Sequence, residues 1–330
     1  MVNEGNDTGI DRVTPTGAMR GRSPRMLSGM VWMALGIVAG FMVPFFGVVM
    51  TGYGMREMVE ASGTKGFLIA ALEGAIIAAG ASFSSQTYAA MVAISFVAVA
   101  GTVWLMHAQR ATVGGVSVLV AVVTLLNLGV EMSFAMMAGT TVSEVYREMF
   151  TVMTDGALQA AGGGIQAELM VRQLEPVFMA IWPFVYVVSS LSDVLAASIG
   201  SFLMGARTSG MAKIPLVASF DMPLWPVAAL ALSVLGLGVS AAGFPGSQVV
   251  LTVSATVLLS VRIIFALQGF GVVLSLMGRY RLGCFGRTAL TVLSIWLETM
   301  FFLVSIVGLV DVWANFRKLE RSSSRNRAHS

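Results

Sequence analysis

Charged residues are scarce in this chain. Asp, Glu, Lys and Arg make up 11% of its 330 residues, whereas hydrophobic residues make up 56%. A water-soluble domain usually carries about a quarter charged residues. Because so few charges cannot cover the surface of a soluble protein of this size, the composition excludes that class and indicates an integral membrane protein.

Cysteine and histidine are nearly absent as well. The chain has one cysteine, Cys284, and two histidines, His107 and His329, far apart in sequence. A single cysteine excludes an intrachain disulfide and a multi-cysteine metal site. No hydrolase, zinc-protease or P-loop motif is present. We therefore expect no enzyme activity, no metal and no cofactor.

The basic residues do not form the surface that a nucleic-acid-binding protein needs. Lys and Arg concentrate near the two ends of the chain and are not interleaved with aromatic residues. Basic segments beside apolar runs favour contact with anionic lipid headgroups. We expect the lipid bilayer as a partner, and no nucleic acid.

Long apolar runs are what the chain has instead. Residues 26–55, 74–109 and 222–261 contain no charged residue. A helix crosses the hydrocarbon core with about 20 residues, and these runs do not alternate as barrel strands do. The sequence therefore predicts an all-α, polytopic membrane helix bundle of about eight transmembrane helices. Their predicted ranges are Met30–Met50 (with Pro44 inside it), Gly66–Ala81, Tyr88–Met106, Val113–Met137, Pro176–Met204, Leu224–Ala242, Gln248–Met277 and Leu290–Val310, and a polar loop up to Lys65 follows the first.

The longest hydrophilic segment between these runs covers residues 138–175. Thr141 and Glu144 fit a capping box, which begins a helix. Apolar residues then recur at helical spacing, so an amphipathic helix at the membrane interface is predicted, ending at the glycine run of residues 161–166. We expect a disordered cytoplasmic tail at 1–25, a membrane domain at 26–316 that includes this interfacial segment, and a basic cytoplasmic tail at 317–330.

The distribution of basic residues favours a multi-pass plasma-membrane protein with both termini in the cytoplasm. The basic loop at residues 279–287 does not fit this orientation. A re-entrant segment is the alternative, and the second predicted helix is the first candidate for it.

Five ionisable residues lie within predicted spans, and such residues usually face the bundle interior and pair. We expect Arg262 to pair with Asp193 or Glu298, either as part of a solute site or as an ion pair that only fixes helix packing. The other two are Glu73 and Glu131.

Polar residues form stripes on three predicted helices, and the stripes could meet in one cavity. They are Asn127 with Glu131; Tyr186, Ser189, Ser190 and Asp193; and Thr291, Ser294 and Glu298. The alternative is a set of separate interhelical hydrogen bonds. The predicted ligand-binding residues are Asn127, Glu131, Asp193, Arg262, Gln268 and Glu298.

Gly36 and Gly40 form a patch of small residues on the first predicted helix. Such a patch allows close helix packing, either within the chain or against a partner.

At the other end, the stretch GLVDVWANFRK, Gly308–Lys318, closes the last apolar run. Asp311 is predicted to end the span, with Trp313 and Phe316 at the headgroup level and Arg317 and Lys318 as anchors.

The same stretch resembles the C-terminal signature of the YybS-like bacterial membrane proteins, a family of unknown function. Three further pieces resemble that family in the same order: Leu27–Gly47, Ile214–Pro226 and Leu267–Arg279. The acidic residue usual at the start of the family's first helix is absent, since Ser28 stands before Gly29. The family is thought to be related to the substrate-binding subunits of energy-coupling-factor transporters. In those subunits a small-residue face on the first helix docks a partner membrane protein, and Gly36 and Gly40 would be the analogous surface here.

The resemblance implies uptake of a small solute, with ATPase and coupling subunits as possible partners. The leading expectation is therefore a solute-binding or transport subunit without its own ATPase, of unknown substrate. The alternative is a scaffold or regulatory membrane protein that transports nothing.

Overall fold

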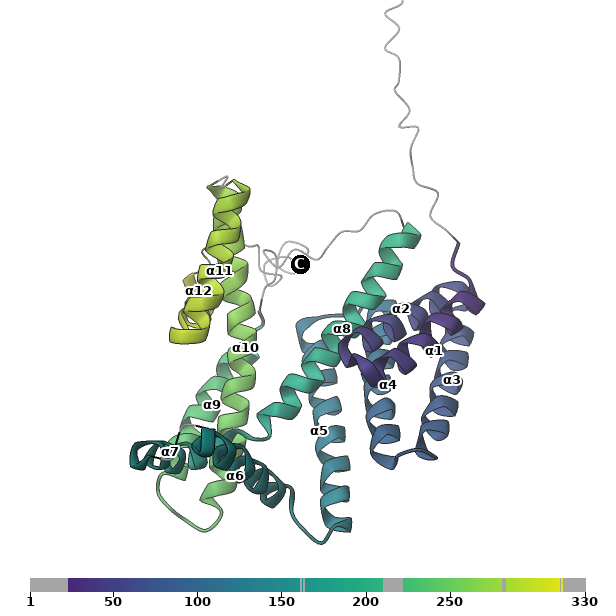
Figure 1. Ribbon diagram of the computed structural model, residues 1–330. Coiled ribbons are helices and arrows are strands. Elements are labelled where there is room, and N and C mark those ends of the chain that lie inside the picture. Colours follow the sequence, from purple (N-terminus) through teal and green to yellow (C-terminus); the bar gives the residue numbers. More distant parts are fainter. Residues whose placement is uncertain are drawn as a thin grey trace, which may run out of the picture.

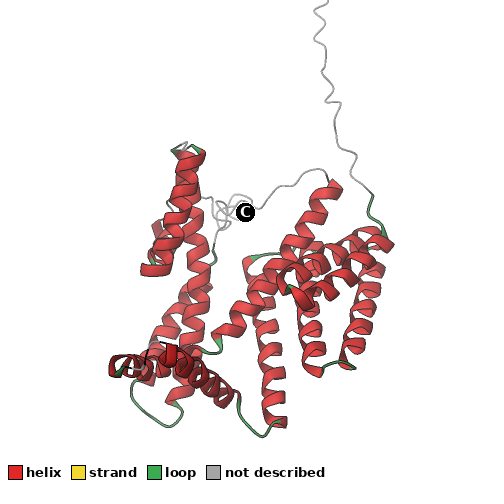
Figure 2. Ribbon diagram, viewed as in Figure 1, coloured by secondary structure: helices red, strands yellow, loops and turns green. Residues whose placement is uncertain are grey.

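The computed structural model describes residues 23–160, 162, 164–209, 222–280, 283–314 and 316. Helices make up this part of the chain and no strand occurs in it (Figure 2), so the all-α prediction is confirmed. The predicted tails at 1–25 and 317–330 lie outside the described residues, apart from residues 23–25.

The helices form two groups (Figure 1). The first holds α1 to α5 and α8, the second holds α9 to α12, and α6 and α7 run between them, in contact with α5 and α10. Their bounds are α1 Met26–Met42, α2 Pro44–Ser62, α3 Thr64–Ser82, α4 Gln86–His107, α5 Val113–Met137, α6 Val142–Ala160, α7 Ile165–Ile181, α8 Phe184–Ser209, α9 Trp225–Ser240, α10 Ser247–Arg279, α11 Cys284–Phe301 and α12 Leu303–Ala314.

The first predicted span is wrong, because the chain reverses inside it. Val43 has non-helical backbone angles, φ −137° and ψ 87°, and Pro44 is the first residue of α2. A residue before proline avoids the helical region, and proline lacks the N–H that a continuing helix would need. The predicted loop up to Lys65 is wrong as well, since α2 continues to Ser62.

Glycines hold α1 and α2 together as an antiparallel hairpin. A Cβ added at Gly36 would come 2.5 Å from the Thr51 amide nitrogen, and one added at Gly54 would come 2.5 Å from the Gly29 carbonyl oxygen. Small residues allow such direct contact between helix backbones. Gly36 and Gly40 therefore serve packing within the chain, and Gly36 is buried there.

Helix α8 crosses this hairpin. A Cβ at Gly52 of α2 would meet the Ala197 carbonyl oxygen at 2.8 Å, and a Cβ at Gly200 would come closer still to the Val49 carbonyl oxygen. The predicted fifth span, Pro176–Met204, is wrong in its first part. Pro176 lies inside α7, and the helix breaks at Trp182 and Pro183 before α8 begins.

Helix α6 begins with the predicted capping box. The Thr141 amide donates to Glu144 Oε2 at 2.8 Å, and the Glu144 amide donates to Thr141 Oγ1 at 3.3 Å. The helix ends at Ala160, before the glycine run, as predicted. It packs on α7 and the start of α8 through aromatic rings, among them Tyr146 and Trp182, whose centroids lie 5.1 Å apart.

The eighth predicted span is also broken. Phe302 has φ +58°, in the left-handed region, and separates α11 from α12, which are bent by 98° relative to each other. Asp311 does not end a helix as predicted, because α12 continues to Ala314 and the Asp311 side chain is buried.

Five of the described helices are long and apolar enough to cross a membrane: α3, α4, α5, α8 and α10. The bent α11–α12 pair would make a sixth, whereas α1 and α9 are shorter apolar helices. Several apolar helices compatible with a membrane-embedded protein are therefore present, but the predicted count of eight is not confirmed.

Candidate functional site

Arg262 of α10 pairs with Glu298 of α11, as one of the two predicted alternatives. Its Nη2 and Nε atoms lie 3.0 Å and 3.1 Å from Glu298 Oε1. The Arg262 side chain is 32% exposed and that of Glu298 is 12% exposed. Glu298 is therefore largely buried, whereas Arg262 is partly exposed.

The same pair closes the break between α11 and α12. The second Glu298 oxygen accepts from the Ser305 amide at 2.8 Å, in the first turn of α12. Arg262 Nη2 donates to the Glu298 carbonyl at 3.2 Å, in the last turn of α11. An acid at a helix N-terminus and a base at a C-terminus both oppose the partial charge of the unsatisfied backbone groups. Glu298 and Arg262 thus each bond to one backbone group beside the break.

Phe302, the residue at the break, lies under Arg262. The guanidinium carbon is 3.7 Å from the centre of the phenyl ring, which is a cation–π contact. Ser305 adds a hydrogen bond from its hydroxyl to Glu298 Oε1 at 2.6 Å. We call Arg262, Glu298, Phe302 and Ser305 the α11–α12 clasp.

Gln268 takes part in a second contact on α10. Its side-chain nitrogen donates to Asp311 Oδ2 at 2.9 Å, and the Phe316 amide donates to Asp311 Oδ1 at 2.8 Å. Gln268 is 1% exposed and Asp311 2% exposed. Gly269 and Gly308 let α10 and α12 approach each other directly beside this pair. Gln268 therefore fixes α12 on α10.

Asp193 of α8 has a different partner. The Ser95 hydroxyl of α4 donates to Asp193 Oδ2 at 2.9 Å. One turn earlier on α8, the Ser190 hydroxyl accepts a hydrogen bond from the side-chain nitrogen of Asn127, on α5, at 3.3 Å. Glu131, also on α5 and one turn after Asn127, is half-buried. The polar stripes of α5 and α8 thus face each other.

The third predicted stripe contacts α10 instead. Glu298 binds Arg262, while the hydroxyls of Thr291 and Ser294 donate to carbonyls of their own helix. The six predicted residues are therefore divided between two places: Asn127, Glu131 and Asp193 in the first group of helices, and Arg262, Gln268 and Glu298 in the second. Glu73 of α3 has a buried Oε2 atom with no hydrogen-bond partner among the described residues.

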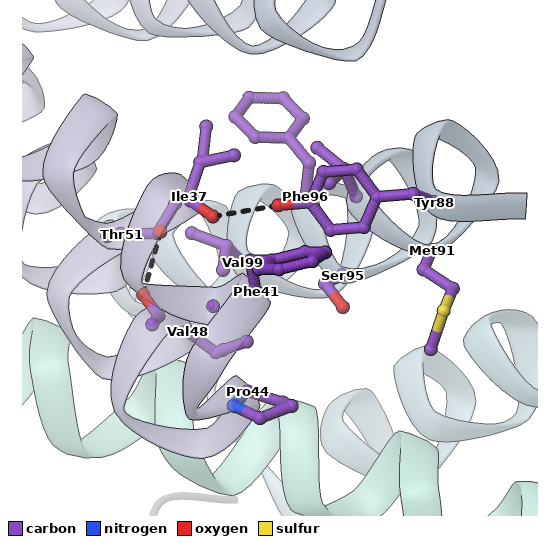
Figure 3. A pocket seen from close by; sticks show the side chains of 14 residues that line it. Ile37, Phe41, Pro44, Val48, Thr51, Tyr88, Met91, Ser95, Phe96 and Val99 are labelled. Carbon is purple, nitrogen blue, oxygen red and sulfur yellow. Dashed lines mark hydrogen bonds between the residues drawn. The ribbon is translucent and has the colours of Figure 1, made fainter. Parts of the chain in front are cut away.

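A pocket of about 270 Å³ lies between the α1–α2 hairpin and α4 (Figure 3). Gly36 and Gly40 are the predicted residues among those lining it, and apolar side chains such as Phe41, Val48 and Phe96 form most of its wall. None of the six predicted ligand-binding residues lines it directly.

Polar groups of the pocket wall are already engaged. The Tyr88 hydroxyl donates to the Ile37 carbonyl at 3.2 Å, and the Thr51 hydroxyl donates to the Gly47 carbonyl at 2.8 Å, as the dashed lines in Figure 3 show. The Ser95 hydroxyl, also in the wall, donates to Asp193. Asp193 itself does not line the pocket, but it is connected to the pocket wall by the hydrogen bond from Ser95.

Sequence reasoning missed Ser95, Ser305 and the binding role of Asp311. Ser95 stands in a run without charged residues, and nothing in that run distinguishes it from other small polar residues. Its only sequence signal would have been that Asp193 needed a donor from a neighbouring helix. Within the described ranges, no group of three or more His, Cys, Asp or Glu residues is arranged to hold a metal ion.

Comparison with known proteins gives no match. No family model matches this sequence, and neither a curated protein nor a solved structure is significantly similar to it.

Proposed function

We propose that this chain is a membrane subunit that binds a small solute in the pocket between the α1–α2 hairpin and α4. The observation that carries the proposal is the pocket itself, lined by three helices and connected to Asp193 by the hydrogen bond of Ser95. Ligand sites are usually mostly apolar hollows with a few polar groups that fix orientation. A volume of about 270 Å³ suits a small molecule.

The proposal includes a role in uptake without an ATPase of its own. It draws on the resemblance to the YybS-like family and, through it, to the substrate-binding subunits of energy-coupling-factor transporters. ATPase and coupling subunits would then supply the energy. A plasma-membrane location with both termini in the cytoplasm belongs to the same proposal, on the strength of the basic residues near the two ends.

A scaffold or regulatory protein is the second candidate, and one observation favours it. Helix α6 leaves apolar side chains exposed on its surface, including Met149, Val152 and Met153. An exposed apolar stripe on a helix can lie in the membrane interface or bind a partner protein. Copurification separates the two candidates: ATPase and coupling subunits would favour transport, whereas envelope or signalling proteins alone would favour the scaffold.

The direct test is ligand binding by the purified chain in lipid nanodiscs. Unfolding temperature is measured with a panel of vitamins and metal ions, because a bound compound stabilises the folded state by mass action. Gly40→Leu should abolish that stabilisation, because Gly40 lines the pocket and a leucine side chain there would occupy it. The backbone should tolerate the change, since a Cβ at this position meets only the Gly47 Cα, at 3.8 Å.

The matched control is Val38→Leu, on the exposed side of the same helix. It should bind as the unchanged chain does. A panel without any stabilising compound, or a stabilisation that Gly40→Leu leaves intact, contradicts the proposed function.

A further inference from the structure

We infer that the pocket takes a small organic cation, an ammonium group on an apolar body, with the Asp193 carboxylate as its counter-charge. The inference rests on the proposed function and names the class of solute. It is carried by three features of the pocket: a carboxylate behind its wall, aromatic rings in its wall and an apolar mouth.

The carboxylate is the first feature. Asp193 lies within α8, one of the helices long and apolar enough to cross a membrane. Within the described residues, the neutral Ser95 hydroxyl is the one hydrogen-bond donor to it. Ionisable groups in a membrane span are costly, and they mark the paths and sites of ions and charged solutes.

The face of α8 that carries Asp193 is turned toward the pocket's helices. Ala197 and Gly200 follow Asp193 at helical spacing, and both contact the backbone of α2. Ala196 and Ala197 belong to the same buried cluster as Val48 and Val92, which line the pocket. Asp193 is thus directed at the α2–α4 side of the molecule.

Ser95 connects the carboxylate to the pocket. A hydroxyl that donates its hydrogen to Asp193 keeps lone pairs that can accept from an ammonium group. Each such hydrogen bond spans about 3 Å, so a cation bound to Ser95 Oγ would lie within about 6 Å of the carboxylate. Opposite charges within that range attract appreciably.

Aromatic rings are the second feature. Phe41 and Tyr88 pack edge to face with their centroids 5.3 Å apart, and Phe96 also lines the pocket. The Tyr88 hydroxyl is engaged with the Ile37 carbonyl, so it is not free to donate to a solute anion. Aromatic faces attract ammonium groups and do not attract anions.

The mouth of the pocket is the third feature. Phe41 is 69% exposed and Met91 61% exposed, and Pro44 at the hairpin turn is exposed as well. All three line the pocket and are labelled in Figure 3. In a bilayer such a rim would face hydrocarbon, so a solute that enters there needs an apolar body.

The test uses a cation and its neutral isostere, phenethylammonium, whose N–H groups can donate to Ser95, and propylbenzene. The full chain is reconstituted in phosphatidylglycerol nanodiscs, whose headgroups carry no ammonium, and binding of each probe is measured. We expect the cation to bind at least about tenfold more tightly than the isostere, as one favourable charge interaction provides.

Asp193→Asn should remove that preference, because it keeps an acceptor for Ser95 and deletes the charge. Phe41→Leu should weaken binding of the cation by about two- to fivefold without weakening binding of the isostere. Glu73→Gln, which replaces another carboxylate within a span but outside the pocket wall, should bind the cation as the unchanged chain does. The retained binding of Glu73→Gln also shows that loss of a span carboxylate is not disruptive by itself.

The outcomes separate the two levels of the proposal. Equal binding of both probes, or a preference that Asp193→Asn leaves intact, overturns the inference of a cationic solute but leaves the proposed solute pocket standing. If neither probe binds, and no compound of the vitamin and metal panel stabilises the chain, both the cation and the proposed function are overturned. If neither probe binds but a panel compound does, the cation alone is overturned.

The ammonium group could belong to a free amine or to a lipid headgroup. Nanodiscs that contain phosphatidylethanolamine, whose headgroup is a primary ammonium, distinguish these sources. Competition by that lipid against phenethylammonium assigns the pocket to a headgroup, and a lack of competition assigns it to a free amine.

Discussion

Glu298 bonds to both sides of the break at Phe302. Its carboxylate accepts from the Ser305 amide at 2.8 Å in α12, and its carbonyl accepts from Arg262 at 3.2 Å at the end of α11. One residue thus holds the end of one helix and the beginning of the next. The two helices that it connects are bent by 98° relative to each other.

The clasp should couple Arg262 and Ser305 energetically. Arg262→Gln removes the counter-charge of Glu298 and is expected to lower the free energy of unfolding by about 1–3 kcal/mol, less than for a fully buried pair because Arg262 is partly exposed. Ser305→Ala is expected to cost about 1 kcal/mol. A double-mutant cycle on the detergent-solubilised protein measures the coupling. Strict additivity of the two losses would contradict a shared network.

Phe302 should show the cost of its left-handed backbone. Phe302→Ala loses the Arg262 contact and keeps a Cβ at φ +58°, whereas Phe302→Gly loses the same contact and relieves the backbone. The glycine variant is therefore expected to be about 1 kcal/mol more stable than the alanine variant. Thermal unfolding of the two variants side by side gives the difference. An alanine variant as stable as the glycine variant would rule out strain at this residue.

Two neighbouring glycines of α1 should respond in opposite ways to alanine. Gly36→Ala places a methyl group 2.5 Å from the Thr51 amide nitrogen and should cost about 1–3 kcal/mol through overpacking. Gly40→Ala meets only the Gly47 Cα at 3.8 Å and should be neutral or stabilising by up to about 1 kcal/mol, because alanine is the better helix former. Unfolding midpoints of both variants test the hairpin packing. Equal effects would contradict it.

The start of α6 should loosen in acid. The Thr141 backbone amide, followed by the Thr141 and Thr140 hydroxyls, holds the pKa of Glu144 below its ordinary value. A lowered pKa means that ionised Glu144 stabilises the folded helix start above the ordinary carboxyl pKa, and that this contribution is lost as pH falls through the lowered value.

The measurement is the NMR shift of the Thr141 amide between about pH 7 and about pH 3, where loss of its hydrogen bond to Glu144 should appear. Glu144→Gln should abolish this transition. Glu148→Gln, one turn further along the helix, should keep it. A transition that survives in Glu144→Gln would assign it to another group.

Sequence patterns predicted the helices that are apolar throughout, such as α4, α5 and α10, within a few residues. They also predicted the capping box at Thr141 and Glu144, where the required residue types are specific. Hydropathy could not find the breaks at Val43 and Phe302, because apolar residues continue on both sides of each. Pro44 was compatible with a kinked span and with a new helix, and only its packing partners distinguish the two.

For the candidate site, the need of a buried charge for a partner predicted that Arg262 would pair with Asp193 or Glu298, and the contact with Glu298 is the one that forms. It did not predict where Asp193 would find a donor, since Ser95 is one of many serines in apolar helices. Nor did it place Asp311 in the interior, because an aspartate near the end of an apolar run looks the same as a membrane exit. Both outcomes depend on which helix faces which, and that information lies in tertiary packing.

The glycine contacts of α1 and α2 have a consequence for the order of folding. The contacts that join α1 to α2, such as that of Gly36 with Thr51, link residues close together in the chain, so the hairpin can form as soon as α2 has been synthesised. Helix α8, whose Gly200 docks on Val49, is synthesised much later and would pack on a hairpin that has already formed. A larger residue at Gly36 should therefore disturb the hairpin while the protein is being synthesised and lower the yield of inserted protein. A larger residue at Gly200 should leave the hairpin intact and affect only the docking of α8 on it.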